Sequence, residues 1–360
     1  MQQYPPSFYV RQIKPRLAAA LSAPASSRLL WLPVHATVVA VATLAIARGW
    51  VPWPVFPALS LLIGLAFGGL MFLGHETMHG AVLRGRLARA KTLVGTLCFA
   101  PLLLSPRLWS VWHNRVHHAN GNRLDVDPDM YPSLAAYRAS GVLRFVTDNF
   151  ALGGGRWRGV ASLLVGFSGQ SLQLLIGARS RLQMSARDHR RALADTALVV
   201  ALWIALAVAI GPVAFALAYL LPLVIANVVV MSFIVTNHGL SPATDANDPL
   251  LGSLSVTVPR WLEWLTLDFG YHVEHHLFPA ASARNGRAIR AALVEVWPER
   301  YQSMPLGAAL ARLFRTGRIY QDATTLVDPR GGGAWPALVP AAVRPEADDP
   351  GNEDGVRRAG

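Results

Sequence analysis

The chain has 360 residues, of which 52% are hydrophobic and only 15% are charged, and its formal net charge is +12. A soluble domain carries about 25% charged residues, so this composition argues against a soluble protein. The single cysteine, Cys98, excludes an intramolecular disulfide and a metal site built from several cysteines of this chain. The basic residues are nearly all arginines between apolar blocks, which favours contact with lipid, and we find no nucleic-acid motif.

Four apolar stretches reach the length of about 20 residues that a membrane-spanning helix needs. They are residues 29–47, 55–74, 193–211 and 213–235. A short link around Trp50 and Trp53 joins the first two, and Gly211 and Pro212 join the last two. We therefore predict an all-α membrane protein with four transmembrane helices in two hairpins, preceded by an N-terminal cytoplasmic segment, residues 1–28.

Basic residues flank these spans asymmetrically. They precede the first span, follow the second and precede the third, whereas the two outer turns contain only Arg48. By the positive-inside rule, both termini and the long middle region are expected in the cytoplasm. The preference for arginine over lysine and the many alanines suggest a GC-rich bacterial genome. We therefore expect a multi-pass protein of a bacterial inner membrane.

Two other apolar stretches do not fit a simple span. Residues 92–104 are too short, and residues 159–178 contain Gln170, Gln173 and three serines. We interpret both as interfacial or re-entrant helices. The membrane domain is expected over residues 29–290, followed by a C-terminal cytoplasmic helical extension over 291–325. Residues 326–360 are rich in proline, glycine and charge, and they are predicted to be disordered.

Nine of the eleven histidines form three clusters and one single residue. They are His75 and His79; His113, His117 and His118; His238; and His272, His275 and His276. On the predicted topology, all nine lie at the cytoplasmic face. Each ring nitrogen needs a partner, and imidazole is the commonest metal ligand among side chains. Because nine histidines exceed the three or four ligands of one zinc site, they suggest two metal ions in a cytoplasmic helical cap.

The spacing within each cluster supports this interpretation. Residues four apart share one face of a helix, as His75 and His79 do. His118 would point about 140° away from His113 on an α-helix, so it needs a helix end or a loop to converge. His35 and His189 stand apart and are expected to be structural or surface residues. Six carboxylates could accept the second ring N–H of a ligand: Glu76, Glu274, Asp125, Asp127, Asp129 and Asp268.

These histidine boxes resemble those of the membrane fatty acid desaturase and hydroxylase superfamily of non-haem di-iron enzymes. The first box is HxxxH, the second HxxxHH and the third HxxHH, with one histidine between the last two. The segment from Tyr271 to Pro279, YHVEHHLFP, is most similar to bacterial acyl-lipid desaturases. Animal acyl-CoA desaturases have asparagine four residues before the single histidine, where this chain has Ile234.

The resemblance implies two iron ions held by the nine histidines, O2 as co-substrate and a fatty acyl chain from the bilayer as substrate. It implies a double bond introduced into an acyl lipid or acyl-CoA. The chain has too few remaining histidines for a fused cytochrome b5 domain, and one cysteine cannot hold an iron–sulfur cluster. Electrons are therefore expected from a separate protein, such as a ferredoxin or a cytochrome b5-like carrier.

Two alternatives stay open. The first is an oxygenase of the same superfamily, either a carotenoid ketolase or hydroxylase or an alkane hydroxylase, because His75-Glu-Thr-Met-His79-Gly also resembles the first box of ketolases. The second is a histidine-rich metal transporter. Transport sites are expected near the bilayer midplane, whereas these clusters lie beyond the predicted spans.

Overall fold

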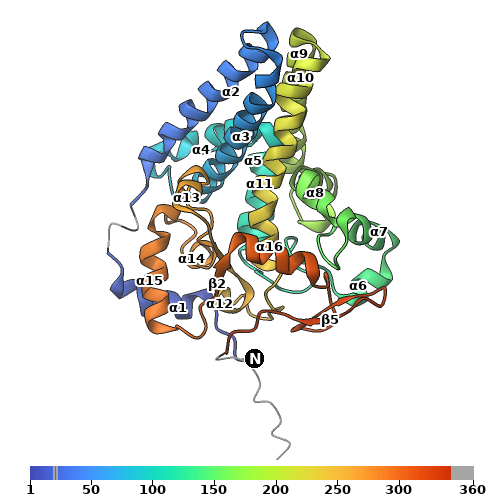
Figure 1. The fold of residues 1–360 in the computed structure, drawn as a ribbon. Helices are drawn as coiled ribbons and strands as arrows, with labels where there is room; N and C mark the ends of the chain where they lie inside the picture. Colours follow the sequence, from blue (N-terminus) through green and yellow to red (C-terminus); the bar gives the residue numbers. More distant parts are fainter. Residues whose placement is uncertain (19–20, 22, 342–360) are drawn as a thin grey trace, which may run out of the picture.

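The computed structural model describes residues 1–18, 21 and 23–341. Its long apolar helices are α2 (Trp31–Arg48), α3 (Phe56–His79), α9 (Ala186–Ile210) and α11 (Leu221–His238). A short helix, α10 (Pro212–Phe215), and a π-helical segment over residues 216–220 lead into α11. These helices coincide with the four predicted spans and rise from one side of the molecule (Figure 1). The predicted helical fold with long apolar helices is confirmed, but the short strands described below make it mostly helical rather than all-α.

Helices α3 and α11 pack closely because two glycines of α3 face branched side chains of α11. A Cβ added at Gly64 would lie 2.6 Å from Ile225, and one at Gly68 would lie 3.3 Å from Val229. The absence of side chains there lets the two helix backbones approach. This contact aligns the C-terminal ends of α3 and α11, where His79 and His238 lie.

More helices than predicted are long and apolar enough to span a membrane. Within the described residues there are five, and the fifth comprises residues 157–181, which include α8 (Ala161–Arg181). A sixth would be a pair bent by 103°, made of residues 85–102 and 106–117. This pair contains α4 (Lys91–Phe99) and α5 (Pro106–Trp109). Length and composition alone therefore do not single out four spans.

Shorter elements cover the ends of α3 and α11. The helices are α1 (Pro6–Ile13), α6 (Leu134–Ala139), α7 (Gly141–Phe150), α12 (Pro249–Gly252), α13 (Arg260–Leu265), α14 (His272–Leu277), α15 (Gly286–Val296) and α16 (Leu306–Arg315). Strands β1 (Ser255–Thr257) and β2 (Ser303–Pro305) pair in parallel, and β3 (Ile319–Tyr320), β4 (Thr325–Asp328) and β5 (Gly333–Pro336) form an antiparallel sheet. Figure 1 shows these elements below the long helices.

The prediction that disorder begins at residue 326 is wrong. Residues 325–328 pair with β3 on one side and with β5 on the other, and Leu326 is fully buried. Gly331 and Gly333 have positive φ values of 88° and 112° and make the tight turn between β4 and β5. The glycines therefore mark a hairpin rather than a disordered segment. The remainder of the prediction, from residue 342 on, lies outside the described residues.

The N-terminal segment is attached to the C-terminal elements through one buried carboxylate. Asp248 accepts hydrogen bonds from the Tyr9 hydroxyl at 2.9 Å and from the Tyr4 backbone N–H at 2.9 Å. The Arg300 guanidinium donates to the same carboxylate at 2.9 Å. Through Asp248, the N-terminal segment and the segment around Arg300 are therefore held together, although they are far apart in the chain.

Candidate metal centre

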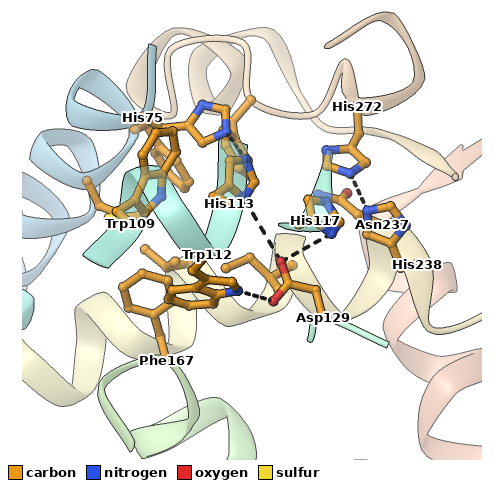
Figure 2. A pocket seen from close by; sticks show the side chains of 15 residues that line it. His75, Trp109, Trp112, His113, His117, Asp129, Phe167, Asn237, His238 and His272 are labelled. Carbon is orange, nitrogen blue, oxygen red and sulfur yellow. Dashed lines mark hydrogen bonds and ion pairs between the residues drawn. The ribbon is translucent and has the colours of Figure 1, made fainter. Parts of the chain in front are cut away.

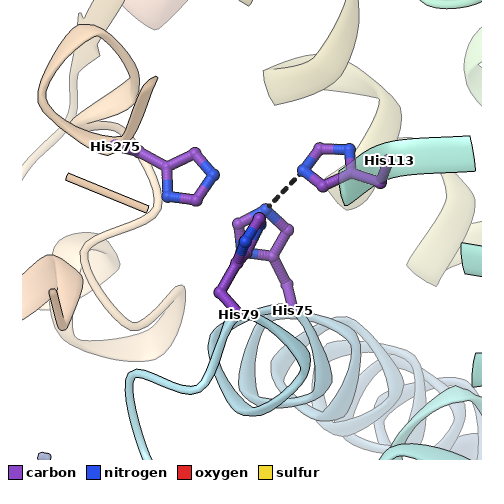
Figure 3. Close-up of side chains that lie close together, drawn as sticks. All are labelled: His75, His79, His113 and His275. Carbon is purple, nitrogen blue, oxygen red and sulfur yellow. Dashed lines mark hydrogen bonds between the residues drawn. The ribbon is translucent and has the colours of Figure 1, made fainter. Parts of the chain in front are cut away.

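Histidines from three separate segments form a first group (Figure 3). His75 and His79 lie in the last turns of α3 and share one face because they are four residues apart. One ring nitrogen of each lies within 4.8 Å of ring nitrogens of His113 and His275. The Nε2 atoms of His75 and His113 are 3.1 Å apart. The first group thus combines both histidines of the first sequence cluster, His113 of the second and His275 of the third.

A second group consists of four buried histidines: His117, His238, His272 and His276. The Nε2 atom of His272 lies 2.7 Å from that of His238 and 3.0 Å from that of His276. The Nε2 atoms of His276 and His117 are 3.2 Å apart. The four Nε2 atoms therefore surround one small volume. The single histidine at the end of α11 thus lies beside one histidine of the second sequence cluster and two of the third.

His118 lies beside the first group, and a π-helix explains how it gets there. Its Nε2 is 3.2 Å from that of His113 and 3.0 Å from that of His275. Residues 110–117 form a π-helix, and the N–H of His118 donates to the carbonyl of His113 at 3.0 Å, an i→i+5 bond. Because a π-turn contains one more residue than an α-turn, His117 and His118 both return to the side of His113.

Two histidines of the second group have acceptors for their Nδ1 hydrogens. The Nδ1 of His117 donates to Oδ1 of Asp127 at 2.8 Å, and the Nδ1 of His238 donates to the carbonyl of Gly252 at 2.9 Å. Because a carboxylate and a carbonyl can only accept, each Nδ1 carries a hydrogen, and in the neutral ring the lone pair is on Nε2, which faces the group. Asp127 therefore takes the role predicted for one of the six carboxylates.

Asp129 lies against both groups. Its Oδ2 is 3.5 Å from Nδ1 of His117 and 4.0 Å from Nδ1 of His113. Its Oδ1 accepts hydrogen bonds from the Trp112 indole at 2.9 Å and the Gln170 amide at 3.1 Å. Burial raises the pKa of Asp129 to about 6, against the lowering effect of nearby His117. Among the residues that the structure describes, Asp129 is the one acid within 4.0 Å of a histidine of each group.

The other four candidate carboxylates bind groups other than histidines. Arg28 pairs with Glu76 and Asp268, Arg290 pairs with Glu274, and Asp125 accepts the backbone N–H of Ser133. Glu76 also accepts hydrogen bonds from Ser282 and Ala283, and Glu274 accepts them from Ser255 and Tyr301. They tie the histidine-bearing segments to the surrounding structure.

The donor set fits two transition-metal ions. Burial lowers the pKa values of His272, His275 and His276 well below the ordinary value for histidine. These rings are therefore neutral near pH 7, the form that binds metal. The Nε2 of His79 is buried and has no hydrogen-bond partner among the described residues. Imidazole suits iron, zinc, copper and nickel, so geometry alone does not choose the element.

An apolar cavity adjoins both groups (Figure 2). Its walls include His75 and His113 from the first group and His117, His238 and His272 from the second. The space between atoms is about 450 Å³. Its other walls are Met71, Phe72, Trp109, Trp112, Asp129, Phe167, Val230, Ile234, Asn237 and Phe269. An apolar chain in this cavity would lie directly against the histidine rings.

A second, smaller cavity of about 350 Å³ lies on the other side of two phenylalanines. It shares Phe72, Phe269, His75 and His272 with the first cavity. The rings of Phe72 and Phe269 have centroids 4.5 Å apart. The residues that separate the cavities are therefore next to one histidine from each group.

Sequence reasoning missed the aromatic walls and one amide. The Trp109 ring stacks on His113 with centroids 4.6 Å apart, and Trp109 and Trp112 lie four residues and one residue before His113. This spacing is a signal that could have indicated them. Both polar side-chain atoms of Asn237 are buried without a hydrogen-bond partner among the described residues. Nothing in the sequence indicates that feature.

His35 and His189 belong to neither group. The Nε2 of His189 binds the carbonyl of Leu175 at 2.8 Å, which confirms a structural role. His35 is buried on α2, where its ring stacks on Trp31 and fits against Gly69. Its Nε2 has no partner within the part of the chain that the structure describes, so the expected hydrogen bond is not found there.

Comparison with known proteins gives consistent matches. The model of the fatty acid desaturase family matches residues 49–307. An sn-1 oleoyl-lipid 12-desaturase of Synechocystis sp. is 26% identical over 281 residues, which cover 74% of this chain and 76% of the relative. A chloroplastic omega-6 fatty acid desaturase of Spinacia oleracea is 26% identical over 259 residues, or 69% of this chain and 55% of the relative.

A third relative matches over a short region. It is an sn-1 acyl-lipid omega-3 desaturase (ferredoxin) of Synechocystis sp., 34% identical over 83 residues, which cover 22% of this chain and 21% of the relative.

The family match covers most of the chain, including every histidine of both groups. The apolar helices agree with an integral membrane protein. The chain therefore belongs to the fatty acid desaturase family and is an oxidoreductase of the membrane.

Proposed function

We propose that this protein introduces a double bond into the acyl chain of a membrane lipid, using two iron ions, O2 and an external electron donor. The observation that carries this proposal is one apolar cavity lined by histidines of both groups. Relatives named for action on oleoyl lipid at position 12 support a lipid-linked acyl substrate and that position. The reaction converts two methylenes, O2, two electrons and two protons into one olefin and two water molecules.

The two groups would hold one iron each. His75, His79, His113, His118 and His275 would hold the first, and His117, His238, His272 and His276 would hold the second. Bound iron supplies the O2-dependent oxidising chemistry that an unactivated C–H bond requires. The protein residues orient the reactants. Asp127 and Gly252 hold two rings with Nε2 inward, and the aromatic walls exclude water and position the alkyl chain.

The chain is proposed to cross the bilayer four times, through α2, α3, α9 and the segment of α10 and α11. Both ends of α8 contact elements on the side where α3 and α11 end. Before α8, the N–H of Gly155 donates to Phe314 at 2.7 Å. Near its end, the carbonyl of Leu175 binds His189 in the first turn of α9. These contacts support a re-entrant or interfacial α8.

Two sets of exposed tryptophans bracket the proposed spans. Trp50 and Trp53 lie in the link between α2 and α3, with 62% and 78% of their surface exposed. Trp157, Trp261 and Trp264 lie on the histidine side, with 80%, 67% and 64% exposed. Tryptophan favours the membrane–water interface. Together with the arginine bias, this supports a cytoplasmic active site and termini, in a bacterial inner membrane.

The electron donor is proposed to be a separate protein that approaches from the histidine side. A ferredoxin is the favoured candidate because one relative carries that word in its name, and a cytochrome b5-like carrier is the alternative. An acidic carrier would be attracted to a chain with a net charge of +12.

Lipid profiling of an expressing host tests the function. The wild-type chain should produce a new unsaturated acyl lipid and should purify with about two irons per chain. His275→Ala should abolish the product, whereas His189→Ala, outside both groups, should retain it. An active protein that yields only saturated products containing oxygen from labelled O2 would instead establish the oxygenase. Exchangeable zinc without lipid oxidation would establish the transporter.

A further inference from the structure

Helix α7 presents its large apolar side chains to the outside. Val142, Phe145, Val146 and Phe150 have 69%, 63%, 36% and 41% of their surface exposed. At 100° per residue these four positions fall within about 140° of one another, so they form one continuous face. A helix of 10 residues is too short to span a bilayer. A soluble surface rarely exposes such a face without a partner.

The opposite side of α7 is fixed to the protein. Thr147 is buried there, and its carbonyl accepts a hydrogen bond from Arg318 at 3.4 Å. The carbonyl of Ala151, just after the helix, accepts another from Arg318 at 2.7 Å, and Arg318 is itself fully buried. Asp148 pairs with Arg330 at 3.4 Å. These contacts hold the apolar face outward.

Exposed arginines flank this face. Arg138 precedes α7, and Arg156 and Arg158 follow it on either side of Trp157. The only acid between residues 138 and 158 is Asp148, which is already paired. An apolar helical face with basic flanks and an exposed tryptophan has the composition of a segment that lies in the headgroup layer of a bilayer.

The position of α7 agrees with that environment. In Figure 1, α7 lies at the outer edge of the molecule beside α8, between the long apolar helices and the sheet that contains β5. On the opposite side, α13 carries the exposed Trp261 and Trp264. The apolar face of α7 therefore continues the membrane surface of the protein on the histidine side.

We propose that α7 lies in the interface of the leaflet on the histidine side, with its apolar face among the acyl chains. In this arrangement Arg138, Arg156 and Arg158 contact anionic headgroups. The chain runs from α7 into α8, which contributes Phe167 to the cavity wall and Gln170 to the hydrogen bond with Asp129. Lipid bound at α7 therefore anchors the start of the element that closes the cavity.

Nitroxide labels measure the depth of α7. The only native cysteine, Cys98, is buried, so a label attaches selectively to an introduced cysteine. In nanodiscs that contain one chain, a label at Phe145→Cys should be more accessible to O2 than to a water-soluble nickel chelate. A label at Arg144→Cys, on the exposed polar side, should show the reverse. Equal nickel accessibility at both positions would overturn the proposal.

A second arm tests the lipid and the alternative occupant. In native mass spectrometry, the wild-type chain should retain phosphatidylglycerol over phosphatidylcholine several-fold more than the triple variant Arg138→Gln, Arg156→Gln, Arg158→Gln. No difference would overturn the arginine contacts. If a second copy covered the face, labels at residue 145 would show dipolar broadening in liposomes and nickel accessibility in single-chain nanodiscs. That result would also overturn the proposal.

Discussion

The rings of Phe72 and Phe269 lie 4.5 Å apart and separate the two cavities next to the histidine groups. Phe72 comes from α3 and Phe269 from the segment before α14, so elements that are distant in sequence build this partition. The shared histidines, His75 and His272, lie beside it. If an acyl chain occupies the first cavity as proposed, this partition limits how far the chain extends past the two histidines.

A smaller side chain at Phe269, one of the two rings between the cavities, should change the distribution of lipid products more than the rate of turnover. Phe269→Leu removes part of the wall at a cost of about 1 kcal/mol, so the protein should stay folded. We expect additional double-bond positions or chain lengths in the lipid products, measured by mass spectrometry of derivatised fatty acids. Phe99→Leu is the control, because Phe99 is buried but lines neither cavity. An unchanged product pattern in Phe269→Leu would refute this role.

The hydrogen bond from His117 to Asp127 should support metal retention. In Asp127→Asn, the amide replaces a carboxylate that accepts from His117 at 2.8 Å and from the N–H of Asn122 at 2.8 Å. We expect metal affinity or activity to fall about 10- to 100-fold. Iron per chain and olefin yield measure the effect. Asp125→Asn, whose carboxylate accepts from the backbone N–H of Ser133, should retain both, and equal losses would contradict the specific contact.

The close packing of α3 against α11 predicts a graded series of glycine substitutions. Gly64→Ala places a Cβ 2.6 Å from Ile225 and should destabilise the protein by about 1–3 kcal/mol. Gly68→Ala, with a 3.3 Å contact, should cost less. Gly169→Ala in α8 meets nothing within 4 Å and should be neutral or stabilising. Thermal unfolding in detergent measures the order, and the idea fails if Gly64→Ala is as stable as Gly169→Ala.

Arg28 should be far more important for stability than an exposed arginine. Its guanidinium lies 2.5 Å from Asp268 and 3.4 Å from Glu76, and it is mostly buried. Arg28→Met leaves buried carboxylate charge unpaired and should cost about 3–5 kcal/mol. Arg16→Met removes an exposed pair with Glu295 and should cost about 1 kcal/mol or less. Equal unfolding temperatures for the two variants would disprove the difference.

The sequence predicts the histidine set because the clusters are dense and the apolar spans bring them to one side. It could not predict how His117 and His118 divide between the groups, because that depends on a π-helix whose i→i+5 bond is not evident in residue types. The prediction of disorder from Leu326 onward was wrong at β4 and β5 because glycines and charged residues are common both in flexible tails and in hairpin turns. The cavity walls depend on tertiary contacts, such as Phe72 against Phe269, that no local pattern encodes.

The third histidine cluster has a consequence for biosynthesis. His275 belongs to the first group, and His272 and His276 belong to the second, so the first group stays incomplete until residue 275 has been synthesised and the second until residue 276. His75 and His79, in the last turns of α3, are synthesised long before that. If the two groups bind metal as proposed, either complete group can be loaded only after α14 has been synthesised, and a chain truncated before α14 lacks the full complement of both.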